Sequence, residues 1–253
     1  MGSHSLRRVT HWRNPLRISL RNPLILAAIL LASFAFSPAA TGDETPSPFR
    51  LDYRLKSEGI PFSIVATRSL SQVKDGLWKM EVHAKNWLGE IRETALFNWQ
   101  GCTPLSNYYG YERRGLGKVK EAKLHIDRQT GVAASERTDK PMRSYDVSDN
   151  ATDELSVSLA LQCELRDGAR EIELQVADER AQKTHHYTVT GAETLTIDGD
   201  KVETLKVQRQ RGKNSDRQTY MWFAPGHDYT LVQLMQKNDD GEHLMTLQSL
   251  KGL

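Results

Sequence analysis

The stretch Thr152-Asp-Glu-Leu-Ser-Val-Ser-Leu-Ala-Leu-Gln-Cys163 interrupts a chain that otherwise consists of short segments of alternating apolar and polar residues. Asn150, Thr152 and Asp153 ahead of Leu155 are suitable N-cap residues, and Leu155 and Leu159 would share one helical face, which favours a short helix. Apolar residues at every second position up to Leu165 also fit a strand. We expect a short helix near residues 152–163, between two β-rich halves, with a strand as the alternative.

On both sides of this stretch the sequence has the period of half-buried strands. Apolar and charged residues alternate over residues 49–56, and the Asp-Gly pairs at 75–76 and 198–199 suit the positive φ of hairpin turns. Residues 136–150 are polar and are expected to form a loop. About eleven or twelve short strands joined by tight turns predict a mainly β fold, an antiparallel meander. A sheet of that size should curl into a half-barrel or open barrel.

The first forty residues differ in kind from the rest. Five arginines come with no acidic residue, the run Pro23–Phe36 is apolar, and Ser37–Ala40 offers small residues. This order is typical of a secretory signal peptide, and the apolar run is shorter than the roughly 20 residues of a membrane span. We therefore expect residues 1–40 to be removed and the protein to be periplasmic, with a retained inner-membrane anchor as the alternative. Residues 41–48 would be a flexible lead and 49–253 a single β-rich domain.

Export would change the charge of the protein. The whole chain has 34 basic and 32 acidic residues, and loss of the five leader arginines leaves 29 basic residues against 32 acidic ones. The basic character therefore belongs to the leader. Because nucleic-acid binding needs a clustered basic surface, we expect no nucleic-acid partner.

Cys102 and Cys163 are the two cysteines of the chain, and both follow the expected leader. In an oxidising compartment such a pair is typical of a disulfide. The alternative is two buried thiols that never meet, since cysteine is common in protein cores.

Aromatic residues on the expected inner face are candidates for contact with an apolar ligand. A curled sheet with one apolar face can enclose a lipid-like or other apolar small molecule. The alternative is that these rings pack against one another as an ordinary core. We expect the tyrosine-rich segment 102–114 to be an edge strand or loop whose rings pack on the sheet, rather than the lining of a cleft. The candidate residues are Trp78, Phe97, Trp99, Tyr109, Trp222 and Phe223.

The sequence contains no convincing catalytic or metal-binding pattern. His185 and His186 are adjacent, and in a strand neighbouring side chains point to opposite faces, so the two cannot easily share a metal ion. There is no Gly-x-Ser-x-Gly elbow and no paired-cysteine spacing, and Gly115-Leu-Gly117 lacks the rest of a dinucleotide motif. We predict no catalytic residues, no metal and no cofactor.

From the central stretch to the C-terminus, several short patterns occur in a characteristic order. They are Asp153-x-Leu-Ser156, a strand ending at Tyr187, the hairpin from Gly191-Ala-Glu193 to Asp198-Gly-Asp200, Val202–Val207, Trp222, and Asp228–Val232. In these features the chain resembles the exported bacterial proteins of the DUF3108 family, over most of the part after the leader. Thr230-Leu-Val232 stands where members usually have Leu-Pro before the penultimate strand. The resemblance implies an exported β-rich fold and no established activity.

Two functions from different classes fit these features. The first is a non-catalytic periplasmic protein that binds or carries a lipid-like or other apolar ligand inside the curled sheet. The second is an envelope structural or assembly factor that binds protein partners through exposed strand edges. An interior space of suitable size favours the first function, and a filled interior with an exposed apolar edge favours the second.

Overall fold

The computed structural model describes residues 45–251, apart from residues 75, 116, 213–214 and 240. The expected leader lies outside the described residues. The described chain contains fifteen strands, one α-helix, α1 (Val157–Arg166), and one short 3-10 helix, η1 (Pro225–His227). The strands are β1 (Phe49–Ser57), β2 (Ile64–Lys74), β3 (Leu77–Asn86), β4 (Gly89–Gln100), β5 (Thr103–Gly115), β6 (Lys118–Asp127), β7 (Val132–Arg137), β8 (Lys140–Asp146), β9 (Thr152–Asp153), β10 (Glu171–Ala177), β11 (Gln182–Ile197), β12 (Asp200–Gln210), β13 (Gln218–Ala224), β14 (Thr230–Asn238) and β15 (Gly241–Leu247).

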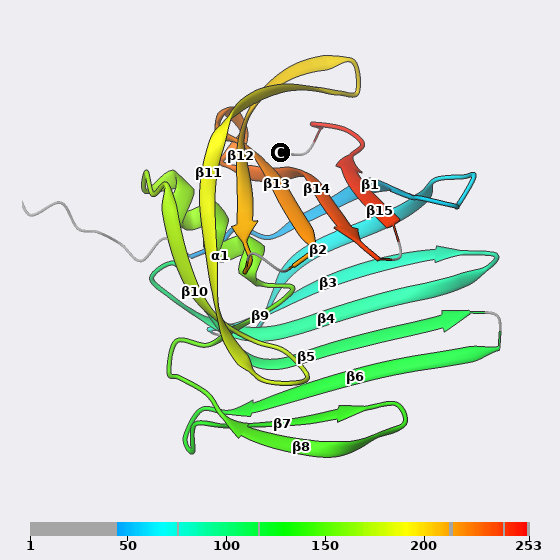
Figure 1. The fold of residues 1–253 in the computed structure, drawn as a ribbon. Helices are drawn as coiled ribbons and strands as arrows, with labels where there is room; N and C mark the ends of the chain where they lie inside the picture. The colour runs from blue at the N-terminus through cyan, green and yellow to red at the C-terminus, as the bar shows by residue number, and fades with distance from the viewer. Residues whose placement is uncertain (1–44, 75, 116, 213–214, 240, 252–253) are drawn as a thin grey trace, which may run out of the picture. The chain divides into compact units, whose positions relative to one another are not determined.

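These strands form one large sheet, in which sequence neighbours are almost always sheet neighbours (Figure 1). The order is β8 to β1, then β15 back to β9, so that β1 pairs with β15 and joins the two halves. The predicted antiparallel meander is therefore confirmed. Among the described strands, β9 and β10 pair in parallel, and the other neighbouring strands pair antiparallel. Parallel neighbours need a crossover connection, and α1 supplies it.

The predicted short helix is present, and its bounds differ from those expected. It begins at Val157 and runs to Arg166, and Thr152 and Asp153 form the short strand β9 instead. The Asp153 carboxylate accepts hydrogen bonds from the backbone N–H groups of Leu155 (2.9 Å) and Ser156 (2.8 Å) and from the Ser156 hydroxyl (2.7 Å). Asp153 thus orders the turn that leads into the helix, from a position upstream of the N-cap residue Ser156.

Two expectations about the sheet edge are wrong. Residues 136–150, expected as a loop, contain the end of β7 and all of the edge strand β8. Strand β8 is exposed on both faces, and Met142 is 69% exposed. Its sequence therefore lacks the alternation of apolar and polar residues by which a half-buried strand is predicted. The tyrosine-rich segment is strand β5, which lies between β4 and β6 and is therefore not an edge strand or loop.

The helix lies within the curve of the sheet (Figure 1) and is buried against both halves of it. Val157, Leu161 and Leu165 pack with residues of β10 to β14, including Phe223. Leu159 packs with Trp78, Met80 and Phe97 of the other half. The buried side chains of this helix occupy the space inside the curved sheet, which in a barrel would be filled by side chains or a ligand. Neither described helix is long and apolar enough to cross a membrane.

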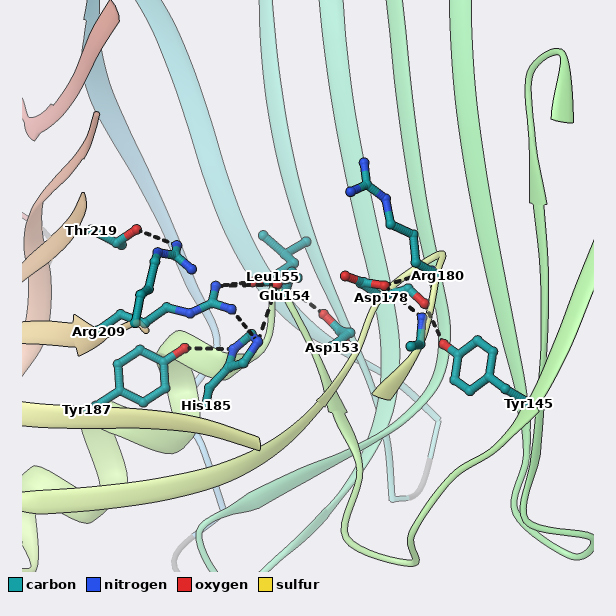
Figure 2. Close-up of polar contacts among 12 residues, drawn as sticks. Tyr145, Asp153, Glu154, Leu155, Asp178, Arg180, His185, Tyr187, Arg209 and Thr219 are labelled. Atoms are coloured by element: carbon teal, nitrogen blue, oxygen red, sulfur yellow. Dashed lines mark hydrogen bonds and ion pairs between the residues drawn. The ribbon is translucent and has the colours of Figure 1, made fainter. Parts of the chain in front are cut away.

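The sheet is open, because its edge strands β8 and β9 are not hydrogen-bonded to each other. Side chains of β8 instead reach the turn between β10 and β11. The Tyr145 hydroxyl donates to the Asp178 carbonyl, and Arg143 Nη1 donates to the Arg180 carbonyl at 3.4 Å. Figure 2 shows Tyr145 pointing at this turn. The architecture is an open barrel with polar contacts across its gap.

Candidate functional site

A pocket of about 390 Å³ lies beside α1, at the end of the sheet where β1 begins. We call it the Arg68 pocket. It is lined by α1, β1, β2, β4, η1 with the residues that follow it up to the start of β14, and residues 45–48. Its apolar lining residues are Phe49, Leu51, Leu70, Trp99 and Leu159, and its polar side chains include Arg68, Gln162, Arg166, His227 and Asp228.

Arg68 is the unusual residue of this pocket. It lies between Ala66 and Leu70 on the core-facing side of β2 and is only 3% exposed. Its Nη2 donates to the Ser158 hydroxyl of α1 at 2.6 Å, and its guanidinium carbon lies 5.2 Å from the ring centroid of Phe49. Among residues 45–251 that are described, no acidic side chain forms an ion pair with Arg68.

A buried charge without a counter-ion is costly, and buried arginines are normally paired. Arg68 also acts on its neighbour Tyr53: burial raises the pKa of the Tyr53 hydroxyl, and the guanidinium charge opposes that rise. The planar guanidinium can bind a carboxylate or phosphate through two parallel hydrogen bonds. The pocket therefore combines a binding group for an anion with apolar walls.

The wall of the pocket is held by contacts between α1 and the residues after η1. Arg166 Nη1 lies 3.1 Å from a carboxylate oxygen of Asp228, and Gln162 Nε2 donates to the Asp228 carbonyl at 2.7 Å. Asp228 has a left-handed backbone, with φ of 48°, which turns the chain back toward the helix. These contacts fix the polar side of the pocket.

The predicted pairing of Cys102 with Cys163 is confirmed, because the two form a disulfide with a Cα–Cα distance of 5.4 Å. The bond joins α1 to the turn between β4 and β5, and Cys163 itself lines the Arg68 pocket. Asp167 lies beside this pair, and the three offer ligand atoms within 4.8 Å of one another. Since both sulfurs are bonded to each other, they do not provide thiolates for a metal ion.

A second polar cluster lies near the start of α1 and contains Glu154, His185, Tyr187 and Arg209 (Figure 2). Arg209 Nη1 lies 3.4 Å from each carboxylate oxygen of Glu154, and Arg209 Nη2 donates to His185 Nε2. Because an arginine only donates, Nε2 must be the accepting nitrogen of a neutral imidazole. Nδ1 then carries the proton and donates to the Tyr187 hydroxyl, 3.3 Å away.

The environment keeps His185 neutral. Burial is the main cause that lowers the pKa of His185 to about 3, and the positive charges of Arg209, Arg211 and Lys183 add to it. The imidazole is 4% exposed. His185 is thus a hydrogen-bonding link between an arginine and a tyrosine at neutral pH. The adjacent residue His186 is exposed and points to the opposite face of β11, as strand geometry predicts. Its Nδ1 lies 3.4 Å from a carboxylate oxygen of Glu173.

The six aromatic candidates are spread over the interior. Trp99 lines the Arg68 pocket. Trp78 and Phe97 are buried next to it, in the cluster that holds Leu159. Phe223 is buried against α1. The structure thus brings one of the candidates to the pocket and buries the others in packed clusters.

The other two candidates make polar contacts as well. The Tyr109 hydroxyl donates to Glu93 at 3.0 Å, and burial, followed by the Glu93 charge, raises the pKa of Tyr109. Trp222 Nε1 donates to Glu193 at 2.7 Å, and the Lys206 ammonium lies 5.1 Å from a Trp222 ring. The Tyr109 hydroxyl and the Trp222 indole N–H therefore each have a hydrogen-bond partner within the fold.

Sequence reasoning missed Arg68, although a signal was available. With a period of two, Arg68 is in phase with Ala66 and Leu70, so it lies on the buried face of its strand. His185 is in phase with Tyr187 in the same way. A charged or titratable residue at an apolar position of a strand is the feature that would have identified both.

The fold and the pocket define a class of protein, an open β-barrel built by one meandering sheet around a buried helix. The chain belongs to the DUF3108 family, because the family model described as a protein of unknown function (DUF3108) matches residues 49–248. The resemblance seen in the sequence is thereby confirmed. Comparison with curated proteins finds no match.

A solved structure of similar fold is the crystal structure of a beta-barrel-like protein of domain of unknown function DUF1849 from Brucella abortus. The similarity has a TM-score of 0.51 at 8% sequence identity and covers 79% of this chain and 95% of that chain. At this identity the similarity concerns the fold alone. It agrees with the predicted barrel-like architecture.

Proposed function

We propose that this protein is an exported, periplasmic binding protein for an amphiphile with one anionic head group and an apolar tail. The head group would bind Arg68, and the tail would lie against the apolar wall formed by residues such as Leu70 and Trp99. The observation that carries this proposal is the guanidinium of Arg68, buried at a pocket without an acidic partner among the described residues. It refines the expectation of a lipid-like or other apolar ligand.

The size of the pocket supports a small amphiphile. Ligand pockets range from about 300 to 1,000 Å³, and 390 Å³ is at the lower end of that range. Each buried methylene adds roughly 0.8 kcal/mol of favourable transfer free energy, so a chain of several carbons contributes usefully to affinity. A charge-assisted hydrogen bond to Arg68 would add roughly 1.5–3 kcal/mol and select against neutral molecules.

The proposed location rests on two features. Residues 1–40 have the order of a secretory signal peptide. The Cys102–Cys163 disulfide is of a kind that persists in oxidising compartments such as the bacterial periplasm.

Native mass spectrometry of the protein purified from the periplasm, followed by solvent extraction, is the direct test of the proposed function. A co-purifying anionic amphiphile at about one molecule per chain is the expected result. If the protein instead carries no small molecule and does not bind dodecanoate in solution, the amphiphile proposal fails, and the alternative of a protein partner at the sheet edge becomes the working hypothesis.

Substituting Arg68 by methionine should weaken dodecanoate binding by roughly 10- to 150-fold, the equivalent of a lost charge-assisted hydrogen bond. The measurement is isothermal titration calorimetry. The methionine side chain would keep much of the apolar stem, and removal of an unpaired buried charge should leave the melting temperature unchanged or higher. This makes a loss of affinity distinguishable from a loss of folding.

Two controls accompany this variant. Arg54→Met removes an exposed arginine on β1 and should leave dodecanoate affinity unchanged. Dodecanol has the same chain without the charge, and its affinity should change little between wild type and Arg68→Met. Equal affinity of the two proteins for dodecanoate would show that Arg68 does not bind the head group.

A further inference from the structure

We infer that a second site, at the rim of the sheet where β11 begins and β12 ends, binds a phosphate group. We call it the rim site and define it by Lys183, Arg209 and Arg211. A depression of about 550 Å³ lies there, and its lining residues include these three side chains together with His185 and Ser215. It shares no lining residue with the Arg68 pocket.

Positive charge exceeds negative charge at the rim site. The Glu154 carboxylate forms an ion pair with Arg209 at 3.4 Å and holds that guanidinium in place. Lys183 and Arg211 form no ion pair with any described residue. With His185 neutral, three cations and one carboxylate leave two positive charges, which matches the charge of a phosphate monoester.

Arg211 has hydrogen-bonding capacity that the described residues do not use. Its Nη2 donates to the Thr219 hydroxyl at 2.9 Å, and its Nε is buried without a hydrogen-bond partner among the residues that the structure describes. Buried donors are normally satisfied, so an unpaired one calls for an explanation. A phosphate oxygen between Arg211 and Lys183 would provide the missing acceptor after a small rotation of the arginine side chain.

Electrostatic repulsion within the rim site also favours an anion. Burial, and next the charge of Arg209, lower the pKa of Arg211, and Arg217 acts in the same direction. Like charges gathered at one place destabilise the folded state, and a bound dianion would relieve this repulsion. Figure 2 shows that Glu154 and His185 contact Arg209, while Tyr187 contacts His185. The cation at the rim is therefore positioned before the ligand arrives.

The shared chemistry is a phosphate group, which could belong to a small phosphorylated molecule or to a lipid head group. Two probes distinguish these sources. Inorganic phosphate, measured by isothermal titration calorimetry at low salt, reports binding of a small molecule. Co-sedimentation with phosphatidylcholine vesicles containing phosphatidic acid reports binding of a membrane surface, and pure phosphatidylcholine vesicles are its blank.

The rim site should lose affinity for whichever probe it binds when its cations are removed. Arg211→Gln is expected to weaken binding at least about 10-fold and Lys183→Gln about 5-fold, since each removes one charge-assisted contact. Lys183 is not buried, so its replacement tests the site even if Arg211→Gln alters folding. Lys201→Gln, which removes an exposed lysine at the other end of β12, is the matched control and should bind as wild type does.

Three results would overturn the inference: binding of neither probe by the wild-type protein, unchanged binding by both rim variants, or an equal loss in Lys201→Gln. The rim site and the Arg68 pocket are tested separately. Arg68→Met should retain the wild-type affinity for the phosphate probe, and Lys183→Gln should retain the wild-type affinity for dodecanoate. Failure of one site is therefore distinguishable from failure of the other.

Discussion

Without the Cys102–Cys163 disulfide, the folded protein is expected to melt about 10 °C lower under oxidising conditions. The bond closes a chain segment with a sequence separation of 61 residues. In the chain-entropy account, a loop of that length stabilises the folded state by roughly 4 kcal/mol, because the cross-link restricts the unfolded chain. For a domain of about 200 residues, each kcal/mol corresponds to roughly 2–4 °C in melting temperature.

Differential scanning calorimetry of the wild-type protein and of Cys102→Ser/Cys163→Ser measures this effect directly. A reducing agent should lower the melting temperature of the wild type to that of the double variant and should leave the variant unchanged. Using the double variant avoids a free thiol that could form mixed disulfides. Equal melting temperatures for the oxidised wild type and the variant would contradict a stabilising role for the bond.

Loss of the bond should affect the Arg68 pocket as well as stability. Cys163 lines that pocket, and Cys102 lies in the turn between β4 and β5, directly after the strand that carries Trp99. The disulfide therefore ties the helical wall of the pocket to its aromatic wall. The bond therefore lies at the end of the sheet where β1 and β5 begin, which is the end that contains the Arg68 pocket.

Local pattern was sufficient to predict most of the architecture. Alternation of apolar and charged residues identified strands such as β1, and Asp198-Gly199 identified the β11–β12 hairpin, because period and turn chemistry are properties of short segments. The helix was predicted from N-cap candidates and an apolar face, although it begins later than expected, with Ser156 as its N-cap residue and Asp153 ordering the turn before it. Connectivity followed because a meander joins each strand to the next one.

The features that the sequence did not predict depend on contacts between distant segments. Strand β8 carries no apolar face, so its existence follows only from its pairing with β7. The Arg68 pocket combines Phe49, Arg68, Trp99 and Leu159, which belong to four separate elements. A single-residue pattern can show that Arg68 is in phase with buried residues, but only the folded chain shows that no described carboxylate is brought to it.

His185 should make the stability of the protein fall steeply below about pH 6.5. In an unfolded chain a histidine has a pKa near 6.5, whereas burial and the surrounding arginines lower the pKa of His185 to about 3 in the folded state. Above pH 6.5 the imidazole is neutral in both states and contributes nothing to pH dependence. Between pH 6.5 and 3 the unfolded chain binds a proton that the folded chain does not, so the free energy of unfolding decreases by about 1.4 kcal/mol per pH unit.

The effect is measured as a difference between wild type and His185→Gln in urea unfolding at pH 7 and pH 5. Glutamine stays neutral, and its amide oxygen can still accept from Arg209. The free energy of unfolding of the wild type relative to the variant should fall by about 2 kcal/mol between these two pH values. Burial raises the pKa of Glu93, Asp153 and Glu154, which acts with the opposite sign. These carboxyl groups are present in both proteins and largely cancel in the difference.

His186→Gln provides the matched control, since it removes the exposed imidazole of the adjacent residue on the opposite face of β11. It should leave the pH dependence close to that of the wild type. A difference between wild type and His185→Gln that stays constant from pH 7 to pH 5 would mean that the folded protein accepts a proton at His185. In that case the imidazole could not serve as the neutral acceptor for Arg209, and the geometry that positions Arg209 at the rim site would require another explanation.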